Sequence, residues 1–151
     1  MIYDLPVESS ARPSDWDIKP LKELADVVGG GTPDTGVAEY WNPPEHQWVT
    51  PTDISNCDGP VLYRAERQIS AAGLRDSSAT LLPIGTTLLT SRATIGECKI
   101  AGVQVATNQG FSSLVPKAKD GAEVVFYLAQ IAETYFCSLG GRYNFHRSVT
   151  S

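Results

Sequence analysis

The amino-acid sequence predicts an α+β fold: a single compact domain with a twisted, mostly antiparallel sheet, a few short helices and one longer C-terminal helix. Two observations support this. Short runs of β-branched and aliphatic residues, bounded by glycine or proline, recur between residues 60 and 107 and are typical of strands. A long helical repeat of apolar residues occurs only near the C-terminus. With 151 residues, the chain is large enough to bury a core without disulfides or metal ions.

The first part of the chain is expected to be irregular apart from one short helix. Residues 1–15 mix proline and serine without periodicity and are interpreted as a lead-in. Apolar residues at helical spacing after Pro20 predict a helix: Leu21, Leu24, Ala25 and Val28. The glycines at 29–31 would end it. No Gly-Lys-Ser/Thr follows these glycines and no strand is predicted before them, so they do not indicate a phosphate-binding loop.

The middle of the chain combines large aromatic residues with short turns. Trp41 and Trp48 are close enough in sequence to form a wall of the core, and stacking on an exposed base is the alternative. Asp53 could cap or turn the residues that follow it through its carboxylate. Residues 60–63 predict a short strand. Further along the chain, Ser70 is suited to cap a helical turn that begins directly after Ser70.

Three further strands are predicted at Thr86–Thr90, Cys98–Ala101 and Val103–Thr107. Polar residues stand at the junctions of these strands, in the segments Ser91–Thr94 and Thr107–Gly110. Side chains at the ends of strands project from a rigid frame, which is where binding residues often lie.

The residue types at these junctions match those that read base edges. Arginine pairs with guanine, and asparagine or glutamine pairs with adenine, so Arg92, Asn108 and Gln109 are candidate DNA contacts. The alternative is structural. Asn108 and Gln109 would then hold a turn by bonding the backbone, and Arg92 would pair with an acid such as Glu97 or Asp53.

The longest helix is predicted for Gly121–Phe136. Asp120 and Glu123 form a pattern that resembles a capping box at its start, and Gly140-Gly141 would end it. The residues that recur on one helical face are Val124, Leu128, Ile131, Ala132 and Tyr135.

Charge and cysteine usage restrict the function classes. The net charge of −5 argues against a simple nucleic-acid binder, but residues 1–60 carry −8 and residues 61–151 carry +3. The cysteines, Cys57, Cys98 and Cys137, are far apart without a Cys-x-x-Cys pair, so neither a zinc site nor a disulfide framework is indicated. No metal or cofactor is expected. The sequence shows no signal peptide and no apolar run of membrane-spanning length, so we expect a soluble cytoplasmic protein.

Taken together, the motifs resemble the target-recognition domain of the specificity subunit of type I restriction-modification systems. The resemblance covers about residues 15–140 and depends on the order and spacing of these segments: Gly30–Pro33, Tyr40-Trp41, Trp48–Ile54, Ile69 with Gly73-Leu74, Leu82-Pro83 with Gly85-Thr86, Ser91–Gly96 and Thr107–Phe111. The corresponding division is a lead-in at 1–15, a recognition domain at 16–140 and a tail at 141–151.

The resemblance implies an α+β domain that binds one half of a split double-stranded DNA target and has no catalytic residue. Methylation and cleavage in that family belong to separate methyltransferase and restriction subunits, which use S-adenosylmethionine and ATP. A family subunit has two such domains separated by long helices, whereas this chain has one and no long helix after it. It is therefore either a truncated or excised half or a stand-alone relative, and a second recognition half or self-association would complete the target.

The candidate DNA-binding residues are Arg64, Arg67, Arg92, Thr94, Lys99, Asn108, Gln109 and Arg142. Motifs that are shared by domains with different targets suit a framework role, so base reading is also expected in the loops at 55–68, 97–104 and 140–147.

Two other function classes compete with DNA recognition. Glu97-Cys98-Lys99 has the Glu-x-Lys form found in metal-dependent nucleases, with Asp34 or Asp53 as the second carboxylate for Mg²⁺. The distance in sequence between these acids weakens that hypothesis. A protein-interaction module that has lost DNA binding is the other alternative, and the acidic balance is its main support.

Overall fold

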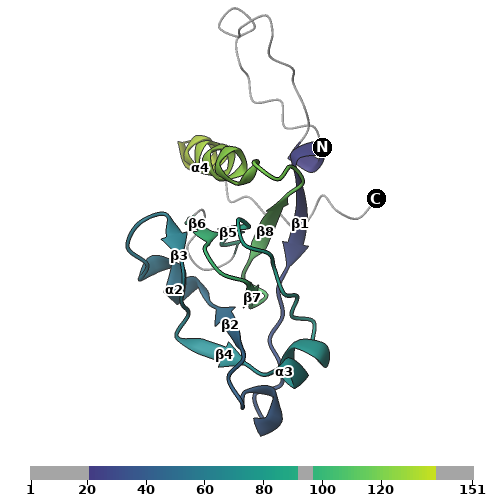
Figure 1. Ribbon diagram of the computed structural model, residues 1–151. Helices are drawn as coiled ribbons and strands as arrows, with labels where there is room; N and C mark the ends of the chain where they lie inside the picture. The colour runs from purple at the N-terminus through teal and green to yellow at the C-terminus, as the bar shows by residue number, and fades with distance from the viewer. Residues whose placement is uncertain (1–20, 92–96, 139–151) are drawn as a thin grey trace, which may run out of the picture.

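A computed structural model describes residues 21–91 and 97–138, and it confirms an α+β fold (Figure 1). The strands are β1 (Ala25–Gly29), β2 (His46–Val49), β3 (Val61–Leu62), β4 (Arg67–Ile69), β5 (Thr87–Leu89), β6 (Cys98–Ala101), β7 (Val105–Thr107) and β8 (Ser112–Pro116). The helices are α1 (Leu21–Leu24), the 3₁₀ turn η1 (Ala38–Tyr40), α2 (Pro51–Ser55), α3 (Ala71–Arg75) and α4 (Ala122–Ser138). The expected lead-in and tail lie outside the described residues.

The strands form two sheets rather than the one that was expected. The five-stranded sheet has the order β1-β8-β5-β6-β3, and the three-stranded sheet has the order β4-β2-β7. Pairs β3/β6 and β2/β7 are parallel and the remaining pairs are antiparallel, so the mostly antiparallel character is confirmed. The chain crosses repeatedly between the sheets. Local strand patterns do not specify partners, which explains why the division was not predicted.

The strands expected around residues 86–107 are present, but they separate. β5 and β6 form an antiparallel hairpin, continued by a hydrogen bond from the Thr90 N–H to the Glu97 carbonyl at 3.2 Å. β7 instead lies beside β2 in the other sheet. The Leu82 N–H bonds the Val105 carbonyl at 2.7 Å, so the segment before β5 is also joined to β7.

The predicted helix from Leu21 to Val28 is wrong in its second half. The helix ends at Leu24, and the chain continues as β1, which pairs with β8 from Ala25↔Pro116 to Gly29↔Ser112. This ladder satisfies the backbone and suits the β-branched pair Val27-Val28, so tertiary pairing overrides the helical spacing. Gly29 is therefore the last residue of a strand, and Gly30 and Gly31 follow a strand rather than a helix.

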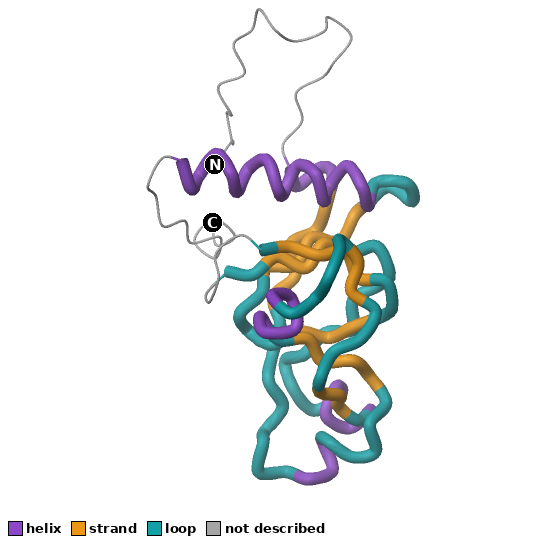
Figure 2. The backbone as a smooth tube through the Cα atoms, turned by 90° about the vertical axis from the view of Figure 1, so that its left-hand side faces the viewer, coloured by secondary structure: helices purple, strands orange, loops and turns teal. Residues whose placement is uncertain are grey.

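The core is built in layers. One cluster fills the space between the two sheets, with Leu62, Leu88 and Ala101 from the five-stranded sheet against Val49 and Val105 from the three-stranded sheet. A second lies between the five-stranded sheet and α4, and a third covers the outer face of the three-stranded sheet. Figures 1 and 2 show α4 at one end of the molecule, with η1, α3 and β4 at the other.

Helix α4 confirms the predicted long helix but not the predicted face. The residues that pack on the sheet are Val125, Phe126 and Ala129, whereas Val124 is 55% exposed and Ile131 58% exposed. The helix carries apolar residues on more than one side, so periodicity alone could not select the buried side. The side chains of Ala132 and Tyr135, and the glycines at 140–141, lie outside the described residues.

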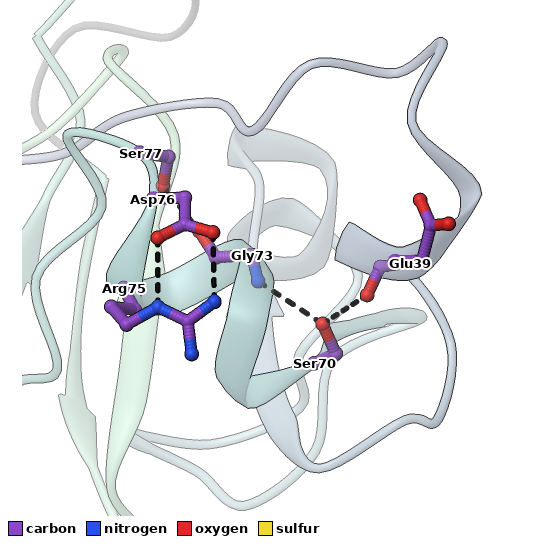
Figure 3. Close-up of polar contacts among 6 residues, drawn as sticks. All are labelled: Glu39, Ser70, Gly73, Arg75, Asp76 and Ser77. Carbon is purple, nitrogen blue, oxygen red and sulfur yellow. Dashed lines mark hydrogen bonds and ion pairs between the residues drawn. The ribbon is translucent and has the colours of Figure 1, made fainter.

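Ser70 caps α3 as predicted. Its hydroxyl oxygen accepts a hydrogen bond from the Gly73 N–H at 3.0 Å, and its O–H donates to the Glu39 carbonyl, which ties α3 to η1 (Figure 3). At the end of the helix, the Arg75 guanidinium bonds the Asp76 carboxylate at 2.8 and 2.9 Å. The hydrogen bond from Arg75 lowers the pKa of Asp76, but the pair is solvent-exposed and contributes little to stability.

Asp53 stabilises α2 by reaching backward rather than forward. Its carboxylate accepts hydrogen bonds from the N–H and the hydroxyl of Thr50, both at 2.7 Å. These bonds pair polar groups of Thr50 at the start of the helix. Its other oxygen accepts from the Glu66 N–H at 2.8 Å. One side chain thus connects α2 to the segment that leads into β4.

We expect Asp53→Ala to lower the free energy of unfolding by about 1–2 kcal/mol, because it removes a helix cap and leaves the Glu66 N–H without its acceptor. Denaturant unfolding of both chains measures this. Asp58→Ala is the matched control, since it removes the same charge from an exposed position nearby. Equal stabilities of the two variants would contradict the role of Asp53.

Candidate nucleic-acid interface

Segments that are far apart in the sequence meet beside β7, and we call this meeting point the motif junction. The Gly31 N–H donates to the Thr107 carbonyl at 2.9 Å, and the Asn108 N–H donates to the Val49 carbonyl at 3.1 Å. The Ser91 N–H donates to the Gly110 carbonyl at 2.8 Å. The motif junction comprises Gly30–Thr32, Trp48–Pro51, Ser91 and Thr107–Gly110.

Asn108 holds the turn at this junction. Its Oδ1 accepts a hydrogen bond from the Gly110 N–H at 2.9 Å, which is the structural alternative left open by the sequence. Gln109 is exposed, and its Oε1 accepts from the Thr32 hydroxyl. Among the described residues, no acceptor engages the amide nitrogen of Gln109. The turn therefore fixes Asn108 and presents Gln109 to solvent.

Arg92, Thr94 and Arg142 lie outside the described residues, so their contacts with DNA stay a prediction. The described residues on either side of the segment 92–96 are nevertheless held by backbone hydrogen bonds. Ser91 bonds Gly110, and Thr90 bonds Glu97. The carboxylates suggested as partners for Arg92 already have other contacts. Glu97 accepts from the Ser55 hydroxyl at 2.6 Å, and Asp53 binds Thr50 and Glu66.

Arg64, on the connection between β3 and β4, and Arg67, the first residue of β4, are both exposed. The backbone between them is held from two sides, because the Ala65 N–H bonds Gln47 Oε1 at 2.8 Å and the Glu66 N–H bonds Asp53. Two arginine side chains thus extend from a fixed stretch of backbone.

The tryptophan wall predicted from the sequence is confirmed. Trp41 and Trp48 pack edge to face with their ring centroids 5.2 Å apart, and Trp48 is buried. The Arg67 guanidinium lies over the Trp41 ring, 3.9 Å from its centroid. This stacking was missed in the sequence, because it depends on the pairing of β2 with β4, for which the sequence carries no local signal.

Lys99 lies on β6 and braces a loop. Its Nζ donates to the carbonyls of Cys57 at 2.9 Å and of Gly59 at 2.6 Å, so two of its three donors are used. In the Glu-x-Lys pair of the nuclease hypothesis, Glu97 thus contacts Ser55, whereas Lys99 contacts this loop. Within residues 21–91 and 97–138, no cluster of three or more histidine, cysteine, aspartate or glutamate side chains could hold a metal ion.

Comparisons with known proteins agree with this arrangement of motifs. A family model described as "Type I restriction modification DNA specificity domain" matches residues 13–149. The chain belongs to this family. The specificity subunit of the type I restriction enzyme MjaIX from Methanocaldococcus jannaschii is 41% identical over 116 residues, which cover 77% of this chain and 27% of that protein.

Solved structures share the fold of this specificity domain. The crystal structure of the HsdS subunit from Thermoanaerobacter tengcongensis aligns with a TM-score of 0.65 at 17% identity, covering 93% of this chain and 33% of that chain. A structure that describes complex assembly and conformational transition of the type I R-M system aligns with a TM-score of 0.57 at 17% identity, covering 87% and 33%. The specificity domain thus spans about a third or less of the relatives it matches. Its described helices include none that is long and apolar enough to cross a membrane.

We expect Gly30→Ala to destabilise the specificity domain by about 3 kcal/mol or more, because a Cβ there would overlap the carbonyl oxygens of Thr107 and Asn108. Thermal unfolding of the purified variants measures the loss. Gly36→Ala is the control, since its added Cβ meets only the Asp34 carboxylate, at 3.3 Å. A Gly30→Ala protein as stable as Gly36→Ala would show that the motif junction has room to adjust.

Proposed function

We propose that this chain is a target-recognition domain that binds one half of a bipartite double-stranded DNA target and carries no catalytic residue. The observation that supports this most strongly is the family match over residues 13–149, which spans every segment of the motif junction. The relative from Methanocaldococcus jannaschii, itself a specificity subunit, gives further support at 41% identity.

The chemistry of the system would belong to partners. A methyltransferase subunit and a restriction subunit would supply methylation and cleavage, and a second recognition half, or a second copy of this chain, would read the other half of the target. One of the structural relatives describes the assembly of a type I R-M complex, which supports such partners. The setting would be a reducing, cytoplasmic one, which the free cysteines Cys57 and Cys98 support.

The proposed DNA-facing residues include the exposed ones that extend from fixed backbone. Arg64, Arg67 and Gln109 are exposed, and Arg92, Thr94 and Arg142 are retained on the sequence pattern alone. The contacts of Asn108 and Lys99 support framework roles, since both bind backbone groups. A metal-dependent nuclease is not favoured, because Glu97 and Lys99 make separate structural contacts.

Charge limits how tightly the chain alone would bind. Its net charge is −5, and only residues 61–151 have an excess of basic over acidic side chains. Affinity for DNA depends largely on the neutralisation of phosphates by Lys and Arg, with release of counterions. Few such contacts are available here.

We expect the 151-residue chain to bind duplex DNA weakly, with an affinity that falls as salt rises. A mobility-shift titration at several salt concentrations measures this. The same DNA, recovered after incubation with Mg²⁺ and with S-adenosylmethionine, should be neither cut nor methylated. Tight binding that is indifferent to salt would contradict the proposal, and Mg²⁺-dependent nicking that Lys99→Ala abolishes would favour the nuclease.

A pair of variants distinguishes a residue that contacts DNA, Arg64, from one that stabilises the fold, Lys99. Arg64→Ala should leave the unfolding midpoint unchanged and weaken DNA binding, with a salt slope smaller by about one unit if its partner is a phosphate. Lys99→Met should lower stability by about 1 kcal/mol, because two backbone carbonyls lose their donor, and leave DNA affinity unchanged. Calorimetry and fluorescence anisotropy on both proteins measure these effects. If Arg64→Ala lowered stability alone and Lys99→Met weakened DNA binding alone, the two roles would have to be exchanged.

A further inference from the structure

Arg67 has an environment unlike that of the other described arginines. It lies on β4 directly opposite Trp48 on β2, and its guanidinium carbon is 3.9 Å from the Trp41 ring centroid and 5.1 Å from that of Trp48. A guanidinium over the face of an indole is attracted by the negative electrostatic potential of the ring face, which restricts the position of the guanidinium. The head group of Arg67 is therefore held over the two indoles although the residue is exposed.

The two indoles under Arg67 are themselves fixed. Trp41 Nε1 donates to the Asp34 carbonyl at 3.1 Å, and Trp48 Nε1 donates to the Gly31 carbonyl at 3.0 Å. The rings meet edge to face at 87°, so neither can rotate without disturbing the other. Since Gly31 also binds Thr107, this tryptophan platform, meaning Trp41 with Trp48, is rigidly connected to the motif junction.

Within the described residues, the guanidinium donors of Arg67 have no acceptor. The ion pairs within the described part of the chain join Arg75 to Asp76 and Lys117 to Asp26, and no hydrogen bond there engages the Arg67 side chain. Arg75 shows the contrast, since its guanidinium is satisfied by a neighbouring carboxylate. Arg67 combines a guanidinium held over the indoles with unused N–H groups, which suits an external ligand with paired acceptors.

Duplex DNA offers such pairs in two places: the O6 and N7 atoms of guanine in the major groove, and the oxygens of a phosphate. Phosphate binding depends mainly on accumulated positive charge, and Arg67 is next to Glu66 in a protein of net charge −5. A bidentate contact with a base edge depends on the geometry of the fork instead, and geometry is what the platform supplies. The surroundings therefore favour the guanine edge.

We propose that Arg67 is a specificity-determining residue that reads one guanine of the half-target, and that Trp41 is its positioning residue. The inference rests on the proposed DNA-binding function. Arg67 would form two parallel N–H···O and N–H···N bonds in the plane of the base, while the indoles below hold the guanidinium at the required angle. Ordering of the side chain before binding reduces the entropy lost on contact.

The test uses the full 151-residue chain and a pool of duplexes with a randomised core. Duplexes retained by the wild-type chain are sequenced, and the preferred duplex is then changed one base pair at a time and titrated. We expect Arg67→Ala to lose about 5- to 100-fold discrimination at one G·C pair while preference elsewhere is kept. Arg67→Lys should lose it too, although the charge remains, because an ammonium has no planar fork.

Two further variants test the positioning role. Trp41→Leu keeps the arginine and an apolar side chain beneath it but removes the aromatic face, so discrimination should fall at the same base pair and at no other. Arg75→Ala is the matched control, because it removes an arginine whose guanidinium is already paired, and it should leave the preference unchanged. Melting temperatures of all variants are measured, and binding is assayed well below them.

Several outcomes would overturn the inference. Unchanged discrimination in Arg67→Ala, with a lower melting temperature, would show that the side chain only covers the indoles. Uniform weakening on all duplexes, a smaller salt slope and rescue by Arg67→Lys would assign a phosphate contact. If Trp41→Leu discriminates like the wild-type chain, Trp41 has no positioning role. If the wild-type chain enriches no duplex, the proposed DNA-binding function itself fails, which differs from failure of Arg67 alone.

Discussion

The hydrogen bond from the Gly110 N–H to the Asn108 side chain holds the point where the chain passes from one sheet to the other. β7 belongs to the three-stranded sheet and β8 to the five-stranded sheet, so this turn determines how the sheets face each other. Backbone bonds from Gly31 and Ser91 meet the chain within the same few residues. The layered core, with Phe111 fully buried directly after the turn, depends on this crossing.

Much of the fold could be predicted where the signal is local. The limits of β6, the cap at Ser70 and the existence of α4 follow from strand-forming residues, a hydroxyl before a helix and sustained helical spacing. Where contacts between distant segments determine the structure, the sequence alone was insufficient to predict it. Residues 25–28 had helical spacing but pair with β8, and the apolar residues of α4 surround too much of the helix to identify its buried side.

The candidate site divides in the same way. The motifs around Thr107–Gly110 and Gly30–Thr32 could be recognised in the sequence, and the alternative roles of Asn108 followed from its residue type. The choice between them needed the position of the Gly110 N–H. Likewise, the charge of Arg67 was visible in the sequence, but the tryptophans beneath its guanidinium were not. The register of β2 and β4 sets Arg67 opposite Trp48, and the connection through η1 brings Trp41 beside Arg67.

The composition of the motif junction has a consequence for how such a domain could evolve. Its principal connections join backbone N–H and carbonyl groups, and Gly30 contributes no side chain to it. Bonds of this kind do not depend on the side chain, apart from the N–H that proline lacks, although Gly30 must stay without a Cβ and Asn108 supplies its side chain to the turn. Substitutions at the exposed positions of the β3–β4 connection, which do not include the buried Ala65, could therefore accumulate without loss of the frame. Selection could then change a half-target by exchanging a few side chains while the architecture is inherited intact.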